Sequence, residues 1–355
     1  MILKGNNDKF LNKKYWFHVL LLLCIALPIA SLIVLDYLNI ESNAEFNKLF
    51  YFLNTWKGRM FYIFFLWLLF LESIINWEEI VKAKPENYSR ILFSIIVVFT
   101  PLFYVLSVNF WGFDQFVLDL GRDLGFSGLR LVKHWVLSFE YSVFTFPFLI
   151  GIVLAYGKNG LKFFSVSLSL LIGVSIFYTL DTFYPEGTLK PLELLALPTA
   201  ACAAALLDSM GYSFVFQYIP GPKAMPIITL NGVYRIGIAW PCAGVHSLFL
   251  YLIIISLLFK KSSISNFRKL IYFIIGVVGT YFVNILRIAS YFVILKNDGI
   301  SAAEFFHRTT GELYFFFWMF AYILLIIVVE RFTLVERIRL YVKKIFTIFR
   351  KGKKV

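Results

Sequence analysis

The sequence contains few charged residues and few cysteines. Only 15% of its 355 residues are Asp, Glu, Lys or Arg, whereas about 25% of the residues in a typical soluble domain are charged. A soluble protein of this length needs a polar surface, so the composition excludes most soluble enzyme folds. Three cysteines, of which Cys24 and Cys202 lie inside apolar runs, provide neither a disulfide framework nor a C-x-x-C metal motif. We therefore expect no metal and no cofactor.

Apolar and aromatic residues are abundant instead. Hydrophobic residues make up 60% of the chain, which includes 41 Phe, 20 Tyr and 8 Trp, and the mean hydropathy is +0.77. The net charge of +13 comes from basic residues in short clusters between apolar stretches. This pattern is typical of membrane proteins and excludes nucleic acid as a partner.

The apolar stretches are long enough to cross a membrane. A helix needs roughly 20 apolar residues to span about 30 Å of hydrocarbon. We predict an all-α polytopic membrane protein with about eight spans, near residues 15–35, 60–77, 91–108, 135–156, 163–180, 244–259, 270–295 and 313–329. The first is interpreted as an anchor rather than a cleaved signal peptide, because it is long and no small-x-small cleavage site follows it.

A ninth apolar stretch, residues 192–207, is shorter and contains Glu193 and Pro198. We interpret it as a re-entrant or interfacial helix, because a ninth crossing would conflict with the distribution of basic residues. Roughly two thirds of the 34 Lys and Arg residues lie in both tails and in alternate loops, and such residues collect on the cytoplasmic side. The loops counted on the outer side include the one with Lys48, Lys57 and Arg59. The chain is therefore predicted to lie in the plasma membrane with both termini cytoplasmic.

The segment before Cys242 differs in composition from the apolar stretches. Gly and Pro residues interrupt it, and Asn231-Gly232 separates two β-branched runs at 227–230 and 233–238, which predicts a hairpin. We divide the chain into N-terminal transmembrane helices (1–180), an extracytoplasmic or re-entrant segment with a small extended cap (181–241), further transmembrane helices (242–330) and a basic cytoplasmic tail (331–355). The tail can lie on anionic lipid or be solvated.

Cys242 is the first candidate for chemistry. It follows Pro241 and precedes Ala243-Gly244, where an extended segment gives way to a helix. The N-terminus of a helix favours a thiolate, which suits a nucleophile. A single cysteine in an apolar environment is more commonly inert, so Cys242 alone is weak evidence.

Arg287 is the second candidate, because it lies inside a predicted span about 12 Å from its outer end at 1.5 Å per residue. An arginine within a span usually lines a cavity, pairs with a carboxylate or acts on a substrate. Asn284 lies three residues earlier on the same helical face, where it can orient Arg287 or line the same cavity. A structural ion pair and snorkelling to the interface are the alternatives.

His307 is the third candidate and lies just before the last span, on the same predicted side. Acyl transfer by a thiol needs a base, a donor for the developing oxyanion and a proton for the leaving amine. Cys242, Arg287 and His307 supply these groups. His246 competes with His307, because it is four residues after Cys242 and shares its helical face.

Three segments resemble the exosortase/archaeosortase family of integral membrane cysteine transpeptidases. Residues 241–248, Pro-Cys-Ala-Gly-Val-His-Ser-Leu, are similar to the family's Cys-Ser/Thr-Gly-hydrophobic-x-Ser-hydrophobic element, including Gly244. Residues 284–288, Asn-Ile-Leu-Arg-Ile, are similar to its Asn-hydrophobic-x-Arg-hydrophobic element, and Phe-His at 306–307 with Gly311 is similar to its His element. The resemblance extends over residues 178–322. Ala243 departs from it, because the family commonly has a hydroxyl residue there.

The resemblance implies an enzyme that cleaves a C-terminal sorting signal, composed of a short motif, a transmembrane helix and a basic cluster, from exported proteins. The new C-terminus would be transferred to a lipid or cell-surface acceptor. Cys242 would be the nucleophile, His307 the general acid and base, and Arg287 the group that stabilises the thiolate or oxyanion. One alternative is a transporter that uses Arg287 as a substrate-binding charge, although no repeated halves are apparent in the sequence. A non-enzymatic assembly or scaffold protein is a second alternative, but it leaves Cys242 and Arg287 unexplained.

Overall fold

The computed structural model describes residues 7–42, 46–83, 87–184, 194–219, 225–230, 232, 234–240, 242–308 and 310–331. The predicted turn at Asn231, the Pro241 position and the basic tail after Arg331 lie outside these residues. The chain divides into two compact units, Met1–Pro185 and Glu186–Val355, and each is described by itself.

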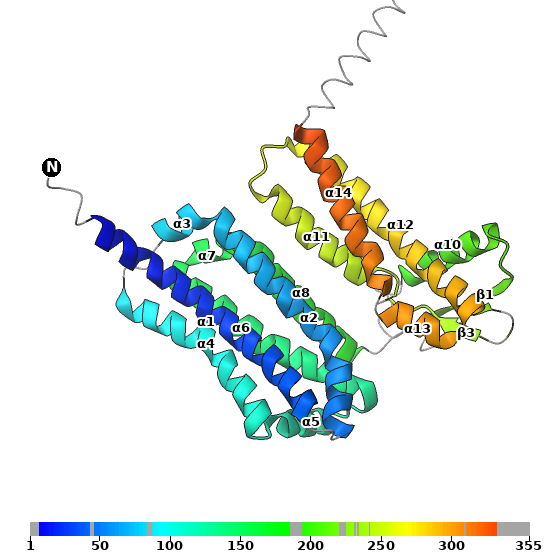
Figure 1. Cartoon of the computed structure of the whole chain (residues 1–355), viewed down its shortest axis with the longest axis horizontal. Helices are drawn as coiled ribbons and strands as arrows, with labels where there is room; N and C mark the ends of the chain where they lie inside the picture. The colour runs from blue at the N-terminus through cyan, green and yellow to red at the C-terminus, as the bar shows by residue number, and fades with distance from the viewer. Residues whose placement is uncertain are drawn as a thin grey trace, which may run out of the picture. The chain divides into compact units, whose positions relative to one another are not determined.

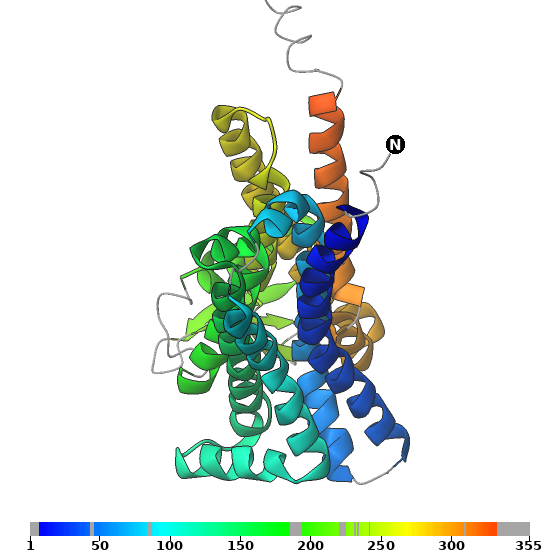
Figure 2. The ribbon, with the colours of Figure 1, turned by 90° about the vertical axis from the view of Figure 1, so that its left-hand side faces the viewer.

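The first unit is a helical bundle. Five long helices lie side by side: α1 (Asn7–Ser42), α2 (Phe46–Ile75), α4 (Tyr88–Phe110), α6 (Val136–Tyr156) and α8 (Ser165–Phe183) (Figure 1). The short helices α3 (Trp77–Lys82) and α7 (Lys158–Phe163) lie at one end of the bundle, and α5 (Phe113–Asp123) crosses the other end (Figures 1 and 2). A π-helical turn, η1 (Arg130–Trp135), leads into α6.

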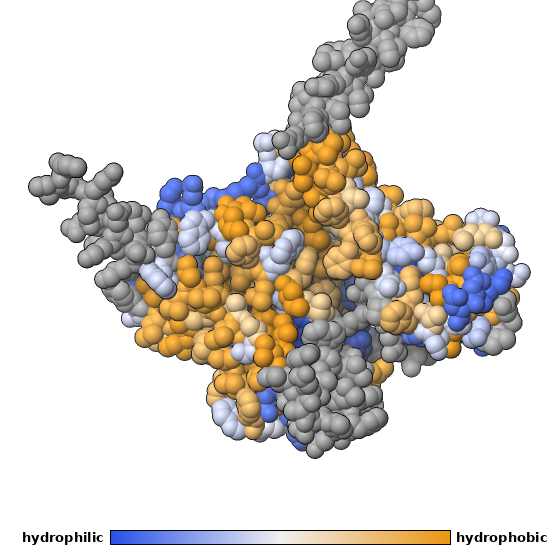
Figure 3. Space-filling view, in the orientation of Figure 1, coloured by the Kyte–Doolittle hydropathy of each residue, from blue (hydrophilic) through white to orange (hydrophobic). Residues whose placement is uncertain are grey.

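The prediction of an all-α polytopic membrane protein is confirmed. Within the part of the chain that the structure describes, seven helices are long and apolar enough to cross a membrane: Trp16–Leu35, Gly58–Ile75, Ser89–Phe110, Arg130–Tyr156, Ser165–Phe183, Asn266–Asp298 and Leu313–Glu330. Large apolar side chains such as Phe70 and Phe103 are exposed on them, and apolar residues cover most of the visible helix surfaces (Figure 3). Such surfaces are stable in contact with lipid rather than water.

One residue of the first unit is placed differently from the sequence-based prediction. The count of basic residues by loop places Arg59 in an outer loop. In the structure Arg59 lies inside α2 and is only 2% exposed. Its Nε atom donates to Oε1 and Oε2 of Glu140 on α6 at 3.1 and 3.2 Å, and Glu140 is fully buried. A buried arginine is tolerated when a carboxylate compensates its charge, so this ion pair joins two helices within the bundle.

The second unit combines three long helices with a small sheet. Helices α11 (Val245–Lys260), α12 (Asn266–Asp298) and α14 (Leu313–Arg331) run side by side (Figure 1). At one end of these helices lie α10 (Ala196–Ser209), α13 (Ile300–Arg308), the short η2 (Thr310–Glu312) and the strands. The loop between α11 and α12 lies at the other end, where Arg268 pairs with Glu330 at 3.2 Å.

The sheet has three antiparallel strands in the order β1 (Phe214–Ile219), β2 (Met225–Leu230) and β3 (Tyr234–Gly237). Strands β2 and β3 pair across residues 231–233, and β1 adds a strand that the sequence analysis does not identify. Alternate residues of β2 are buried, as expected for a strand with one face on a core. Ile228 and Leu230 pack in a core shared with α10, α12 and α13, so the sheet is fixed beside the end of α12.

Two apolar helices of this unit are shorter than the others. Helix α11, which corresponds to the predicted span at 244–259, has 16 residues, and a helix rises about 1.5 Å per residue. Its length is therefore about 24 Å, against roughly 30 Å of hydrocarbon. Helix α10 has 14 residues, and its buried alanines pack in the core of the unit. The predicted number of eight crossings depends on whether α11 spans the membrane, so this number stays a prediction. The re-entrant or interfacial position of α10 also stays a prediction.

Candidate active site

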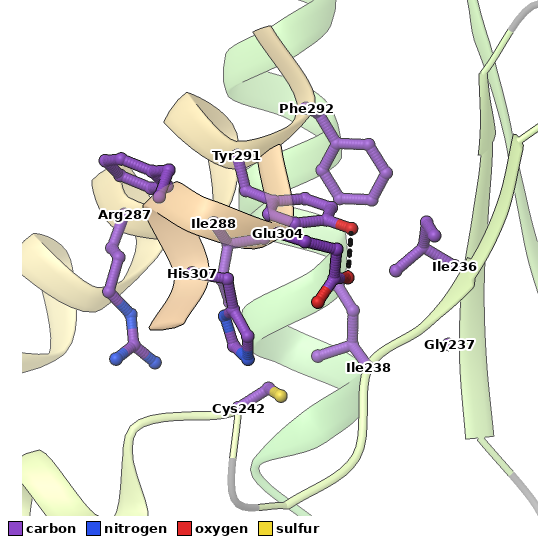
Figure 4. Close-up of a pocket in the computed structure, with 11 residues that line it drawn as sticks. Ile236, Gly237, Ile238, Cys242, Arg287, Ile288, Tyr291, Phe292, Glu304 and His307 are labelled. Carbon is purple, nitrogen blue, oxygen red and sulfur yellow. Dashed lines mark hydrogen bonds between the residues drawn. The ribbon is translucent and has the colours of Figure 1, made fainter. Parts of the chain in front are cut away.

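A pocket of about 210 Å³ lies between α12, α13 and the segment that follows β3. Cys242, Arg287, Glu304 and His307 contribute its reactive and charged groups. Its other lining residues are Ile236, Gly237, Ile238, Ile288, Tyr291, Phe292 and Phe306. In Figure 4 the imidazole of His307 points toward Cys242, and the guanidinium of Arg287 lies on the far side of that imidazole. The three candidate residues from separate sequence motifs therefore meet in one pocket.

Cys242 lies in a tight turn between β3 and α11. Its N–H donates to the carbonyl of Ala239 at 3.0 Å, and Ala243 makes a similar bond at 3.1 Å. Gly244 then caps the N-terminus of α11 with a φ of 93°, in the left-handed region that favours glycine. The side chain of Cys242 is half-buried at the pocket wall.

Asn284 supports this turn rather than lining the pocket. It is only 3% exposed, and its Nδ2 donates to the carbonyl oxygen of Cys242 at 3.0 Å. A Cβ atom on Gly244 would lie 2.9 Å from Cγ of Asn284, which is too close. Gly244 therefore allows the amide to reach the turn. The Thr199 hydroxyl of α10 also contacts this turn, at 3.4 Å from the carbonyl oxygen of the fully buried Ala243.

Arg287 projects from α12 into the pocket. Tyr291 is four residues after Arg287 and three after Ile288, so it neighbours both on the helix surface, and all three line the pocket. Gly311 packs against this arginine, since a Cβ atom there would be 3.6 Å from Cδ of Arg287 and 3.0 Å from the carbonyl of Phe306. A larger residue at 311 would push into the α13 backbone.

The two histidines that compete as acid and base lie in different places. His307 is on α13, is exposed and lines the pocket with Cys242. His246 is in the first turn of α11, and its ring centroid is 5.4 Å from that of the buried Trp240. Among the described residues, His307 is the histidine that lines the pocket.

Sequence reasoning missed two functional groups of the pocket, Tyr291 and Glu304. The Tyr291 hydroxyl donates to Oε1 of Glu304 at 3.1 Å (Figure 4). The ring of Tyr291 also meets that of His307 edge to face, with centroids 5.9 Å apart. Helical spacing could have identified both, because Tyr291 is four residues after Arg287 and Glu304 is three residues before His307.

The apolar helices and the pocket define a multi-pass membrane protein with a thiol, a guanidinium and an imidazole in one site. The model of the transmembrane exosortases (Exosortase_EpsH) matches residues 54–325, and the chain therefore belongs to this family. No curated protein and no solved structure matches the chain. The resemblance derived from the three motifs is thus confirmed. Family membership supports a transpeptidase function in the membrane and implies the processing of exported proteins with sorting signals.

Proposed function

We propose that this protein is a membrane-embedded cysteine peptidase and transpeptidase. It cleaves a C-terminal sorting signal, made of a short motif, a transmembrane helix and a basic cluster, from an exported protein. It then transfers the protein to a lipid or cell-surface acceptor. The observation that carries this proposal is the shared pocket of Cys242, Arg287 and His307 in a chain of the exosortase family. That match favours this hypothesis over a transporter.

Each residue has one role in the proposed reaction. The thiolate of Cys242 attacks the scissile carbonyl and forms a thioester, while His307 protonates the leaving amine. Arg287 stabilises the thiolate and the oxyanion of the tetrahedral intermediate through its planar set of N–H donors. Ile238 and Phe292 make part of the pocket wall apolar, and charge interactions are stronger beside apolar groups than in bulk water.

The side of the membrane that we propose for the pocket is inferred from basic residues at the opposite end of the second unit. The end opposite the pocket carries Lys260, Lys261, Arg268 and Lys269 in and around the loop between α11 and α12. Such a cluster collects on the cytoplasmic side. The pocket therefore faces the extracytoplasmic side, where the scissile bond of an exported protein would be presented.

Labelling of two matched serines tests this orientation. Ser263 and Ser301 are both exposed and lie at opposite ends of the unit. In a variant without native cysteines, Ser301→Cys should react with an impermeant maleimide in intact cells. Ser263→Cys should react only after permeabilisation. The reverse pattern would place the pocket on the cytoplasmic side and contradict the proposal.

Depletion of the protein in its host tests the function. We expect exported proteins that retain a C-terminal transmembrane helix and basic cluster to accumulate in the membrane fraction, because nothing removes their sorting signal. Mass spectrometry of C-terminal peptides before and after depletion measures this accumulation. Re-expression of the wild-type chain should restore the processed termini. An unchanged set of C-termini would refute the proposed activity.

A further inference from the structure

Glu304 gives the pocket a charge of opposite sign to Arg287. Among the described residues that line the pocket, Glu304 is the one acidic side chain. In the view of Figure 4 its carboxylate lies toward Ile238, whereas the Arg287 guanidinium lies on the other side, with His307 and Cys242 between them. The proposed roles of Cys242, Arg287 and His307 leave this carboxylate without a function.

The structure holds Glu304 in a defined position. Its Oε1 accepts the hydroxyl proton of Tyr291 at 3.1 Å, and the Tyr291 ring contacts His307 at a centroid distance of 5.9 Å. Tyr291 therefore fixes the carboxylate relative to the imidazole. The neighbouring wall is formed by Ile236, Ile238 and Phe292. A carboxylate beside apolar side chains is costly, and it binds a cation more strongly than it would in water.

Glu304 also faces a second, shallower hollow. This hollow is lined by Ile300, Ser301, Glu304 and Phe305 on α13. Ile300, Ser301 and Phe305 are exposed, so the hollow opens at the surface of the unit. Glu304 thus lines both the pocket that holds Cys242 and a hollow that opens on the surface of α13.

We infer that Glu304 binds the ammonium group of a primary-amine acceptor and places its nitrogen beside the thioester on Cys242. This inference rests on the proposed transpeptidase function and extends it to the chemical class of the acceptor. A carboxylate is the complementary group for an ammonium, whereas it repels a phosphate or carboxylate acceptor. Arg287 would repel an ammonium on the other side of the pocket, so the two charges separate the acceptor from the oxyanion.

The transfer step conserves atoms and charge. One proton of the bound ammonium passes to Glu304 and from there to water, which leaves a neutral amine. The amine nitrogen forms a bond to the thioester carbonyl carbon, and the carbon–sulfur bond breaks with its electron pair on Sγ of Cys242. His307, which became neutral when it protonated the leaving amine, takes the second proton from nitrogen. The products are an amide, the Cys242 thiolate and protonated His307.

A comparison of two acceptors on the full-length protein tests the inference. The acyl donor is an exported protein that accumulates on depletion, and the purified enzyme is reconstituted in phosphatidylcholine vesicles. Ethylamine is a cation at neutral pH, whereas hydroxylamine is neutral and also cleaves thioesters. In Glu304→Gln the rate ratio of transfer to ethylamine over hydroxylamine should fall about 10-fold or more, because an ion-pair hydrogen bond is lost. Mass spectrometry of the products measures this ratio.

Two further variants distinguish acceptor binding from a structural role. Asp298→Asn removes a carboxylate from the end of α12 that does not line the pocket, and it should leave the ratio unchanged. Tyr291→Phe should lower the ratio less than Glu304→Gln, because it keeps the charge but removes the hydroxyl that holds it. Equal losses with both amines in Glu304→Gln, or loss of the thioester on Cys242 itself, would overturn the inference. Loss of the thioester would mean that Glu304 acts in the first step, either by positioning His307 or by binding the sorting signal.

The same assay separates the two hypotheses and the source of the amine. If the wild-type enzyme forms no thioester on Cys242, the proposed function fails and the inference fails with it. If a thioester forms but Glu304→Gln leaves the ratio unchanged, only the inference fails. Vesicles with added phosphatidylethanolamine identify a lipid source when the product carries this lipid. A product formed only with ethylamine identifies a soluble amine, and either result supports a primary-amine acceptor.

Discussion

Replacement of Cys242 by Ala or Ser is expected to abolish cleavage of the sorting signal. Alanine has no nucleophile, and the hydroxyl of serine is not ionised at neutral pH and attacks a peptide carbonyl much more slowly than a thiolate. Both side chains are small enough for the half-buried position of Cys242, so insertion and abundance should stay normal. The measurement is cleavage of an exported substrate in membranes that contain equal amounts of each variant.

The other two cysteines provide the control for this experiment. Cys202 is exposed on α10, and Cys24 lies within α1 in the first unit. Neither lines the pocket, so Cys202→Ala and Cys24→Ala should process substrate at the wild-type rate. If a Cys242 variant did the same, the thioester mechanism would be wrong.

The positions of the long helices could be predicted because each apolar run has to satisfy a simple physical requirement. A segment in lipid must bond its own backbone groups and expose apolar side chains, so its length and composition are visible locally. The predicted span at 313–329, for example, corresponds to α14 (Leu313–Arg331). Helix α11 is the marginal case, since its 16 residues are fewer than those of the other predicted spans.

The position of Arg59 could not be predicted from the local sequence. A basic residue next to an apolar run is normally counted with the loop. Its partner Glu140 is 81 residues away along the chain, and the ion pair exists only when α2 and α6 pack together. Strand β1 shows a similar limit, because a strand is defined by its partner, and β1 is recognised through its register with β2.

Three polar side chains of the pocket could be singled out from the sequence, although their catalytic roles stay predictions, whereas the contacts around them could not. Arg287 stands out because an arginine inside a span is unusual, and Cys242 and His307 stand out as a thiol near a helix start and a histidine just before the last span. Glu304 and Tyr291 could be placed near His307 and Arg287 by helical spacing, but spacing does not show which elements they contact. Their significance comes from their contact with each other and from the pocket they share.

His307→Ala is expected to lower cleavage by about 100-fold or more, which is the usual contribution of a positioned acid and base. His246→Ala should retain most of the activity, because His246 packs against Trp240 and His307 lines the pocket with Cys242. Proximity in sequence favours His246, since it is one helical turn after Cys242. However, Cys242 lies before Gly244, the N-cap of α11, so Cys242 belongs to the turn and not to the helix that carries His246.

The two histidine variants therefore compare sequence proximity with the contacts of the folded chain. Cleavage is measured in membranes with equal amounts of His307→Ala and His246→Ala, and trapping of the Cys242 thioester shows which step is affected. Without an acid, the leaving amine departs poorly and the tetrahedral intermediate returns to substrate, so His307→Ala should accumulate little thioester. An active His307→Ala beside an inactive His246→Ala would transfer the acid and base role to His246.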